Sequence, residues 1–413
     1  MDKNDDLIKV SFLGDIMCEM PLLKASYIKD NEYNFDDVFK EMKSLFKQSN
    51  YVVGNLETIC AGKEFGYTDH IFNFNTPEQF IESIKNSGID MVTTATNHSL
   101  DRGVEGLKRN LDTLNKYNLE NTGTYLTKED SEKVFYKEID GIKIAFLNYT
   151  YGTNTHINGE ILSSDELFHV GLLKPQKDEI EQYERKQSPK TFKQNLAKVF
   201  FKFVSLEKWF KIKKIFYKTH NKAFQDNDLS YIDKNYLDAV KSDIEKAKNN
   251  ADFTIVCMHS GGQFHPEPGE FSKYMMNFMD KNGVDAVIGN HPHVVQKAEI
   301  LKNDMFGAYC LGNFSISPSS VYILDKDLPE YSILLHIYIG TESKKIEKIS
   351  FSILKIKENK DGSLRVFPVD KLVNKINEQQ KQRLIQNTTK IYNRFTGKNE
   401  KEIKIKREYK LTN

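Results

Sequence analysis

Polar side chains that could do chemistry stand at the ends of five segments that the sequence predicts to be strands. They are Asp15, Glu57, Asn97 with His98, His259, and His291 with His293. In open α/β sheets, functional sites form where the carboxyl ends of the strands meet, so these groups could converge. Any one of them could be an ordinary turn or capping residue. Their recurrence at successive strand ends favours a shared site.

The types of these side chains predict a metal centre. Carboxylate, amide and imidazole ligands without a thiolate suit manganese, iron or zinc rather than a structural zinc. Two carboxylates and three imidazoles are too many for one ordinary catalytic zinc. They indicate two divalent transition metal ions, which lie roughly 3.5–4 Å apart in such sites.

Three neighbouring side chains have two interpretations each. Asp101 and Arg102 closely follow His98, and they could orient it or cap the next helix. His265 lies in a glycine- and proline-rich stretch after His259. It could contact a substrate anion or be a plain surface histidine.

An alternation of strands and helices must position these residues. Apolar runs that end in polar loops predict strands at 8–13, 51–53, 89–95, 253–258, 285–288 and 308–311, and a hairpin of 134–139 with 142–149. Apolar residues at helical spacing predict helices at 35–46, 76–87 (with Thr76 as its cap), 104–117, 235–248, 271–281 and 377–395. Residues 331–339, 346–356 and 364–369 are typical of antiparallel strands. This order of elements predicts an α/β sandwich.

Five motifs occur at these strand ends: Gly14-Asp15, Gly54-Asn55-Leu56-Glu57, Asn97-His98-Ser99-Leu100-Asp101-Arg102-Gly103, Gly289-Asn290-His291-Pro292-His293 and Leu311-Gly312-Asn313-Phe314. In type and order they resemble the CapA family, which is named for capsular poly-γ-glutamate synthesis and is related to the calcineurin-like metallophosphoesterases. The resemblance covers about residues 8–155 and 235–370. It implies a metallophosphoesterase-like four-layer α/β/β/α sandwich with a helical insertion.

The resemblance also implies roles for the matching residues. Asp15 matches the ligand of one metal, Glu57 the bridging carboxylate, and His98 the group that faces the leaving oxygen. The implied metal ligands are Asp15, Glu57, Asn97, His259, His291 and His293. The catalytic candidates are His98 and Asp101, and the substrate-binding candidates are Asn55, Arg102, His265 and Asn313.

One position departs from the enzymatic pattern. Enzymes of the superfamily usually place a histidine two residues after the first aspartate, and this chain has Met17 there. CapA-like sequences commonly lack that histidine too. A single bound metal, or a labile pair, is therefore the alternative to a full binuclear centre.

The resemblance and the change in composition divide the chain into four parts. We expect residues 1–155 and 233–370 to be the two halves of the CapA-like domain. Residues 156–232 form a basic, aromatic-rich insertion, and residues 371–413 form a last helix with a basic tail.

The segment 190–222 departs furthest from the rest of the chain. It holds ten lysines against the single acidic residue Glu207, with aromatic residues at helical spacing between them. Such a basic amphipathic helix could associate with an anionic membrane surface. The alternative is that its apolar stripe packs on the α/β core with the lysines solvated.

Composition excludes several classes of protein. Lys and Arg number 59 against 58 Asp and Glu, and this near-neutral charge argues against a general nucleic-acid binder. Hydrophobic residues at 39% exclude a disordered chain. No signal peptide or transmembrane run is visible, and the four cysteines are scattered, so we expect a cytoplasmic protein or one peripheral at the cytoplasmic membrane face.

These observations lead to one functional hypothesis with two rivals. The leading hypothesis is a metal-dependent phosphoester hydrolase in the synthesis of capsule or another cell-surface polymer, acting on an anionic polymer or a phosphorylated small molecule. One rival is a non-catalytic assembly factor with a degenerate metal site. The other is a metal-dependent amide hydrolase that acts on the polymer.

Overall fold

The computed structural model describes residues 6–187, 204, 208, 209, 212 and 223–412. Most of the basic segment 190–222 lies outside these residues, so its predicted helix and membrane association stay predictions. Among the described helices, none combines the length and the apolar character needed to cross a membrane.

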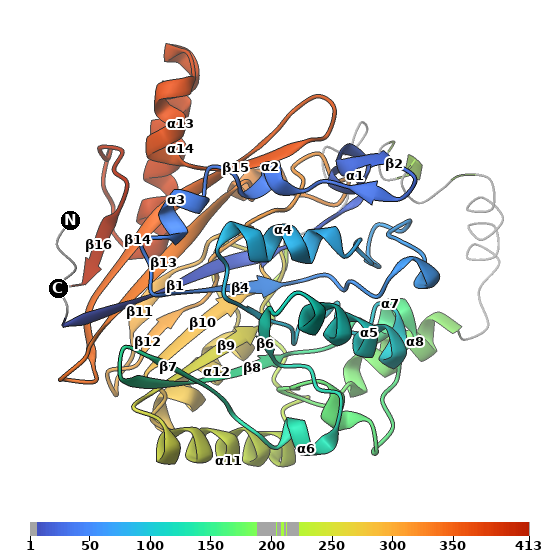
Figure 1. Ribbon diagram of the computed structural model, residues 1–413. Helices are drawn as coiled ribbons and strands as arrows, with labels where there is room; N and C mark the ends of the chain where they lie inside the picture. Colours follow the sequence, from blue (N-terminus) through green and yellow to red (C-terminus); the bar gives the residue numbers. More distant parts are fainter. Residues whose placement is uncertain (1–5, 188–203, 205–207, 210–211, 213–222, 413) are drawn as a thin grey trace.

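Two large sheets form the centre of the molecule (Figure 1). The first sheet has the strand order β15 (Leu364–Pro368), β14 (Ile346–Glu358), β13 (Tyr331–Gly340), β1 (Leu7–Ile16), β4 (Tyr51–Leu56), β5 (Met91–Thr93), β6 (Glu120–Thr122), with β16 (Tyr409–Thr412) also paired to β14. The second sheet has the order β11 (Ala298–Ile300), β12 (Phe306–Ala308), β10 (Ala286–Asn290), β9 (Phe253–His259), β8 (Ile142–Thr150), β7 (Phe135–Ile139). A small hairpin joins β2 (Tyr27–Lys29) to β3 (Glu32–Tyr33).

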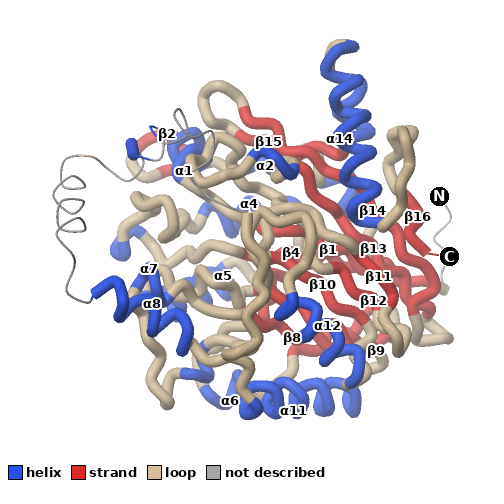
Figure 2. The backbone as a smooth tube through the Cα atoms, turned by 180° about the vertical axis from the view of Figure 1, so that it is seen from behind, coloured by secondary structure: helices blue, strands red, loops and turns tan. Residues whose placement is uncertain are grey.

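Helices cover the outer faces of both sheets. The first sheet carries α1 (Met20–Ser26), α2 (Asp36–Phe39), α3 (Lys43–Phe46), α4 (Gln79–Ser87) and α5 (Gly103–Lys116), and the second carries α11 (Lys234–Asn250) and α12 (Glu270–Lys281). The remaining helices are α6 (Lys128–Ser131), α7 (Thr155–Asn158), α8 (Lys177–Gln187), α13 (Val369–Leu372) and α14 (Glu378–Thr396). In Figure 2, α14 stands at one end of the first sheet, beside β13 and β14.

Successive side chains along each central strand pack in different layers of the sandwich. Val53 of β4 and Ile255 of β9 belong to the apolar cluster between the two sheets, whereas Val52 packs under the helices of the first sheet. Val256 packs under α11 and α12 on the opposite side. Successive strand residues point to opposite faces, so each buried strand supplies two layers. The predicted four-layer α/β/β/α sandwich is confirmed.

Several predicted elements have the expected ends. Asp140 and Gly141 form the hairpin turn with positive φ values of 45° and 81°. Gly88 ends α4 with φ 100°, and Asn377 with Gln380 forms a capping box at the start of α14.

Other boundaries were predicted wrongly. The helix expected at 35–46 is split into α2 and α3, because the Met42 N–H bonds Phe39 O three residues back and tightens the turn. Thr76 does not cap α4: its hydroxyl pairs with that of Thr58 at 2.8 Å. The strand expected at 308–311 is β12, displaced to residues 306–308, where it pairs with β11. The strands β6, β11 and β16 and the β2–β3 hairpin were not predicted from the sequence.

Gly14 brings β1 against the loop that contains Gly312. A Cβ on Gly14 would lie 1.8 Å from Gly312 O, and the Asp15 N–H donates to that same carbonyl at 3.0 Å. The Phe314 N–H in turn donates to Asp15 O at 2.8 Å. This close backbone contact holds Asp15 beside Asn313, and only glycine permits it.

We expect Gly14→Ala to lower the free energy of unfolding by about 3 kcal/mol, since backbone atoms must move to admit the methyl group. Gly397→Ala is the matched control, because nothing lies within 4 Å of a Cβ there and only its φ of 68° opposes the change. That strain costs about 1 kcal/mol. Urea unfolding of the two variants measures the difference, and equal costs would contradict the close-contact explanation.

Candidate metal centre

The predicted ligands come from the carboxyl ends of strands in both sheets. Asp15 lies in β1, Glu57 directly follows β4, and His259 is the last residue of β9. Four strands extend further than predicted, because β1 pairs with β4 at Asp15↔Asn55 and β9 pairs with β10 at Asn290↔His259. Neighbouring strands thus place these ligands at one edge of the sandwich.

Their side chains contact one another directly. His259 Nε2 lies 2.7 Å from Asn97 Oδ1, 3.2 Å from His291 Nδ1 and 3.4 Å from Glu57 Oε1. His293 Nδ1 lies 3.3 Å from Asp15 Oδ2, and its Nε2 lies 3.7 Å from Glu57 Oε1. The structure therefore brings all six ligand candidates together.

The donor set fits metal ions. Ligand atoms of Asp15, Glu57 and His259 lie within 4.8 Å of one another, and so do those of Glu57, His291 and His293. Both carboxylate oxygens of Glu57 and the Nε2 of His291 are buried and lack a hydrogen-bond partner among the described residues. Buried polar atoms normally have partners, so these atoms, which lie within the ligand cluster, are compatible with coordination to a metal ion. Glu57 belongs to both groups.

Burial sets the protonation of these residues in the absence of a cation. It raises the pKa of Glu57 well above its usual range, and the nearby Asp15 carboxylate raises that pKa further. Burial also lowers the pKa of His259 to about 3 and lowers the pKa of His291. Their imidazoles are neutral near pH 7, which is the form that binds metals.

His98 and Asp101 form a buried pair beside the ligands. His98 Nδ1 lies 2.7 Å from Asp101 Oδ2, and the same oxygen accepts the Phe74 N–H at 2.6 Å. The Phe74 ring packs on His98 with centroids 4.5 Å apart. Helix α5 begins at Gly103 without a side-chain cap. Asp101 therefore orients the imidazole of His98 and does not cap the helix.

Asn55 and Asn313 contact the ligands themselves. Asn55 Nδ2 donates to Asp15 Oδ1 at 2.9 Å and lies 3.1 Å from His259 Nδ1, while Thr93 donates to Asn55 Oδ1. Asn313 Oδ1 lies 2.8 Å from His293 Nδ1. Such partners orient ligands and tune their basicity. Both asparagines, predicted as substrate-binding, thus lie in ligand-positioning contacts.

The two other substrate-binding candidates lie outside the ligand cluster. His265 is in the loop after β9, where its Nδ1 lies 3.0 Å from Glu267 O. Arg102 binds the carbonyl oxygens of Phe65 and Asp101. Met17, at the position where enzymes of the superfamily have a histidine, is buried in the apolar cluster under α1–α5.

Two residues near the site were not predicted from the sequence. Glu19 is 2% exposed, accepts from the Ser317 N–H and the Tyr322 hydroxyl, and has its pKa raised to about 7 by burial. Tyr151 packs on His291 with ring centroids 4.7 Å apart. Tyr151 directly follows β8, so the strand-end rule could have found it. An acidic residue four positions after Asp15 was the available signal for Glu19.

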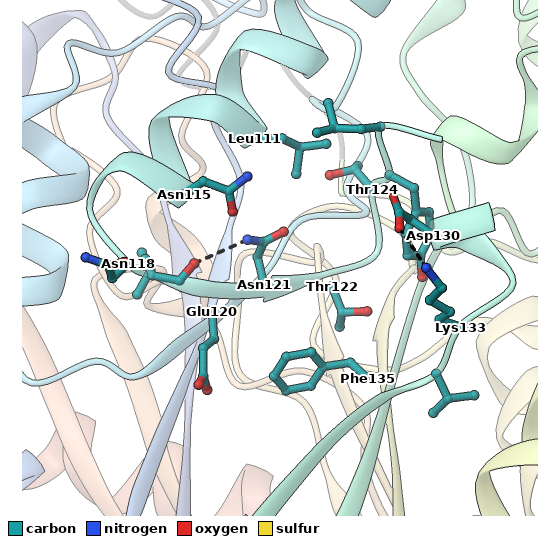
Figure 3. Close-up of a pocket in the computed structure, with 14 residues that line it drawn as sticks. Leu111, Asn115, Asn118, Glu120, Asn121, Thr122, Thr124, Asp130, Lys133 and Phe135 are labelled. Atoms are coloured by element: carbon teal, nitrogen blue, oxygen red, sulfur yellow. Dashed lines mark hydrogen bonds and ion pairs between the residues drawn. The ribbon is translucent and has the colours of Figure 1, made fainter. Parts of the chain in front are cut away.

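A pocket of about 580 Å³ lies elsewhere, between the end of α5, β6 and the start of β7 (Figure 3). Asn115, Asn121, Thr122 and Phe135 are among the residues that line it. None of the predicted site residues does so. This pocket is therefore separate from the ligand cluster.

We expect the purified protein to hold between one and two equivalents of a divalent transition metal. His259→Ala and Asn97→Ala should each lower that content, because each removes a ligand atom from the buried cluster. His265→Ala is the control and should keep the full content. Elemental analysis after desalting gives the measurement, and unchanged metal in both ligand variants would place the metal elsewhere.

Metal binding should release protons near pH 7. Glu57 has a raised pKa and must lose its proton to bind a cation, whereas His259 and His291 are already neutral. Apparent affinity should therefore rise with pH and fall in acid. Calorimetric titration with Mn²⁺ in buffers of different ionisation enthalpy counts the protons. Glu57→Gln should weaken binding and abolish the release.

Comparisons with known proteins agree with this arrangement of motifs. Residues 9–318 match the family model described as "Bacterial capsule synthesis protein PGA_cap". The PGA biosynthesis protein CapA of Bacillus subtilis (strain 168) is 22% identical over 332 residues, covering 80% of this chain and 69% of that protein. The capsule biosynthesis protein CapA of Bacillus anthracis is 21% identical over 336 residues, covering 80% of this chain and 65% of that protein. The chain thus spans about two thirds of the length of these relatives.

Solved structures of similar chains include a phosphatase from Mycoplasma pneumoniae, with a TM-score of 0.40, 15% identity, and coverage of 84% of this chain and 93% of that one. A putative 5'-nucleotidase from Staphylococcus aureus has a TM-score of 0.40, 12% identity, and coverage of 92% of this chain and 57% of that one.

The family model spans most of the sequence, including all five motifs. The chain therefore belongs to the family of bacterial capsule synthesis proteins described as PGA_cap.

Proposed function

We propose that this protein is a metal-dependent phosphoester hydrolase that acts in the synthesis of capsule or another cell-surface polymer. The observation that carries the proposal is the buried Glu57 carboxylate, shared by two groups of ligands and left without a hydrogen-bond partner among the described residues. The polymer context comes from the names of the two CapA relatives. The substrate would be an anionic polymer or a phosphorylated small molecule.

The ligand set suits two divalent ions of manganese, iron or zinc. Asp15, Glu57, Asn97, His259, His291 and His293 would hold them. When bound, such ions stabilise charge on a phosphoryl group and lower the pKa of water toward about 7. Asn55 and Asn313 orient Asp15, His259 and His293 through the contacts described above.

His98 supplies the acid in this mechanism. Asp101 Oδ2 lies 2.7 Å from Nδ1 of His98, and this contact fixes the ring and leaves Nε2 to face the leaving oxygen as the proton donor. The Phe74 ring limits the movement of the imidazole. Proton donation of this kind contributes typically about 10²–10⁴-fold to the rate.

One observation favours a second candidate, a non-catalytic assembly factor. Met17 packs in the apolar core, so the position that supplies a histidine in related enzymes supplies no ligand here. The buried His98–Asp101 pair favours the enzyme, because binding alone does not need a positioned proton donor. Amide bonds of the polymer are the third possible target.

We expect His98→Ala to keep its metal and to lose activity in a way that depends on the leaving group. Hydrolysis of an alkyl phosphate should fall by about 10²–10⁴-fold, because its poor leaving group needs the proton. Hydrolysis of p-nitrophenyl phosphate should fall much less. Phosphate release by the Mn²⁺-loaded protein measures both, and equal losses would remove proton donation from the mechanism. Absence of turnover on all phosphoesters by the wild type would support the assembly factor, or the amide hydrolase if amides are cleaved.

A further inference from the structure

A second pocket, of about 380 Å³, lies beside the His98–Asp101 pair. Its lining comes from the loop of residues 65–73, from Arg102 at the start of α5, and from Ile157. Two hydrogen bonds of Asp101 show that the pocket adjoins the pair. Asp101 accepts the N–H of Phe74, the residue after Asn73 in the pocket, and Arg102 Nη1 donates to Asp101 O at 2.8 Å. A volume of this size suits part of a small molecule.

Arg102 brings into this pocket a guanidinium group that has no direct contact with a carboxylate of the described residues. Its side chain is half-buried, and its hydrogen bonds go to the neutral carbonyl oxygens of Phe65, Gly66 and Asp101. Across the part of the chain that the structure describes, no carboxylate oxygen lies within 4.0 Å of its guanidinium nitrogens. Arg365 and Arg394, also partly buried, pair with Asp37 at 2.7 Å and with Asp327 at 3.2 Å.

The guanidinium group also has free donors. It carries five N–H groups. One on Nε, one on Nη1 and one on Nη2 donate to the three carbonyls, which leaves one N–H on each terminal nitrogen. Two such donors on one planar group match the two oxygens of a carboxylate or phosphate. The carboxylates of Asp101 and Asp69 both interact electrostatically with Arg102, but neither contacts it. Asp69 lies on the rim of the pocket and is exposed, so water screens its effect.

Asn73 offers a complementary acceptor in the same pocket. Its Oδ1 is buried and lacks a hydrogen-bond partner within the described ranges. A buried oxygen of this kind is stabilised by an O–H or N–H group on a ligand. The pocket therefore presents a cation next to an acceptor.

We propose that this pocket binds a second anionic group, a carboxylate or a phosphate, on the leaving-group side of the substrate, with Arg102 as the residue that selects for it. The inference rests on the proposed function, because it takes the phosphoryl group to lie at the metal ligands and the leaving oxygen at His98. The leaving group then extends past the His98–Asp101 pair toward Arg102. A hydroxyl next to the anionic group would meet Asn73.

Three ligands that differ at one end test this assignment. 3-Phosphoglycerate carries a carboxylate there, glycerol 1,3-bisphosphate a phosphate, and glycerol 1-phosphate a neutral hydroxyl. Calorimetric titration into the full-length Mn²⁺-loaded protein should show the first two binding about tenfold more tightly than the third, as expected for one charge-assisted contact. Whichever of the two binds more tightly identifies the anionic group preferred.

Arg102→Met should reduce this preference to about equal affinity, and Arg102→Lys, which keeps the charge without the paired donors, should retain part of it. Arg365→Met is the matched control, because this arginine lies on β15 and pairs with Asp37; it should keep the full preference. Thermal unfolding verifies that each variant is folded. Equal affinity of the wild type for all three ligands, binding of none, or a preference that survives Arg102→Met and Arg102→Lys would overturn the assignment.

Phosphate release from the same ligands separates this inference from the proposed function. A preference that depends on Arg102, without hydrolysis of any ligand, would leave the pocket assigned and reject the phosphoesterase. Hydrolysis of all three with equal kcat/KM would support the phosphoesterase and reject the role of Arg102.

Discussion

The buried Glu57 carboxylate is the constraint on which the rest of the site depends. An ionised carboxylate without a partner is among the least favourable groups to place in a protein interior. Asp15 nearby makes its ionisation harder, while the imidazoles of His259 and His291, whose pKa values are lowered by burial, provide lone pairs and little positive charge. Bound cations would resolve this conflict, because they would satisfy the carboxylate oxygens and the imidazole nitrogens together.

The fold holds these groups in place from several directions. β1 lies between β4 and β13, and its Asp15 is fixed by the backbone of Gly312 and Phe314. The second sheet brings His259 and the His291–His293 loop to the same edge, with an apolar layer between the sheets. The ligands are therefore attached to two rigid sheets, and a loop closes the site at Asn313.

Electrostatic roles are divided between neighbouring parts of the site. The ligand cluster is rich in oxygen and imidazole donors and is deeply buried. Arg102, a few residues past His98, is half-buried and faces a separate pocket with two unused donors. A substrate with two anionic groups would meet metal ions at one end and a guanidinium at the other. The His98–Asp101 pair lies between the two.

The sequence by itself determined the architecture and the membership of the ligand cluster. Alternating apolar strands, helical stripes and turn residues such as Asp140-Gly141 act locally, so they predict elements without knowledge of the fold. The strand-end rule located Asp15, Glu57, Asn97, His259, His291 and His293, because parallel strands in one layer must end at the same edge. The predicted ends of elements were wrong where a residue distant in sequence determines them. The Thr76 hydroxyl, for example, bonds Thr58 and does not cap α4.

Only the tertiary structure decided what each polar residue does. Asn55 and Asn313 were predicted to bind substrate, and the structure shows that each contacts a side chain of the predicted ligand cluster that is distant in sequence. Arg102 became informative only when the structure showed that its guanidinium binds backbone carbonyls and has no carboxylate oxygen of the described residues within 4.0 Å. Glu19 gained its raised pKa from burial by segments some 300 residues away in the chain. The physical reason is that desolvation, hydrogen-bond partners and unpaired charge depend on what packs around a side chain, and the order of residues along the chain does not determine that packing locally.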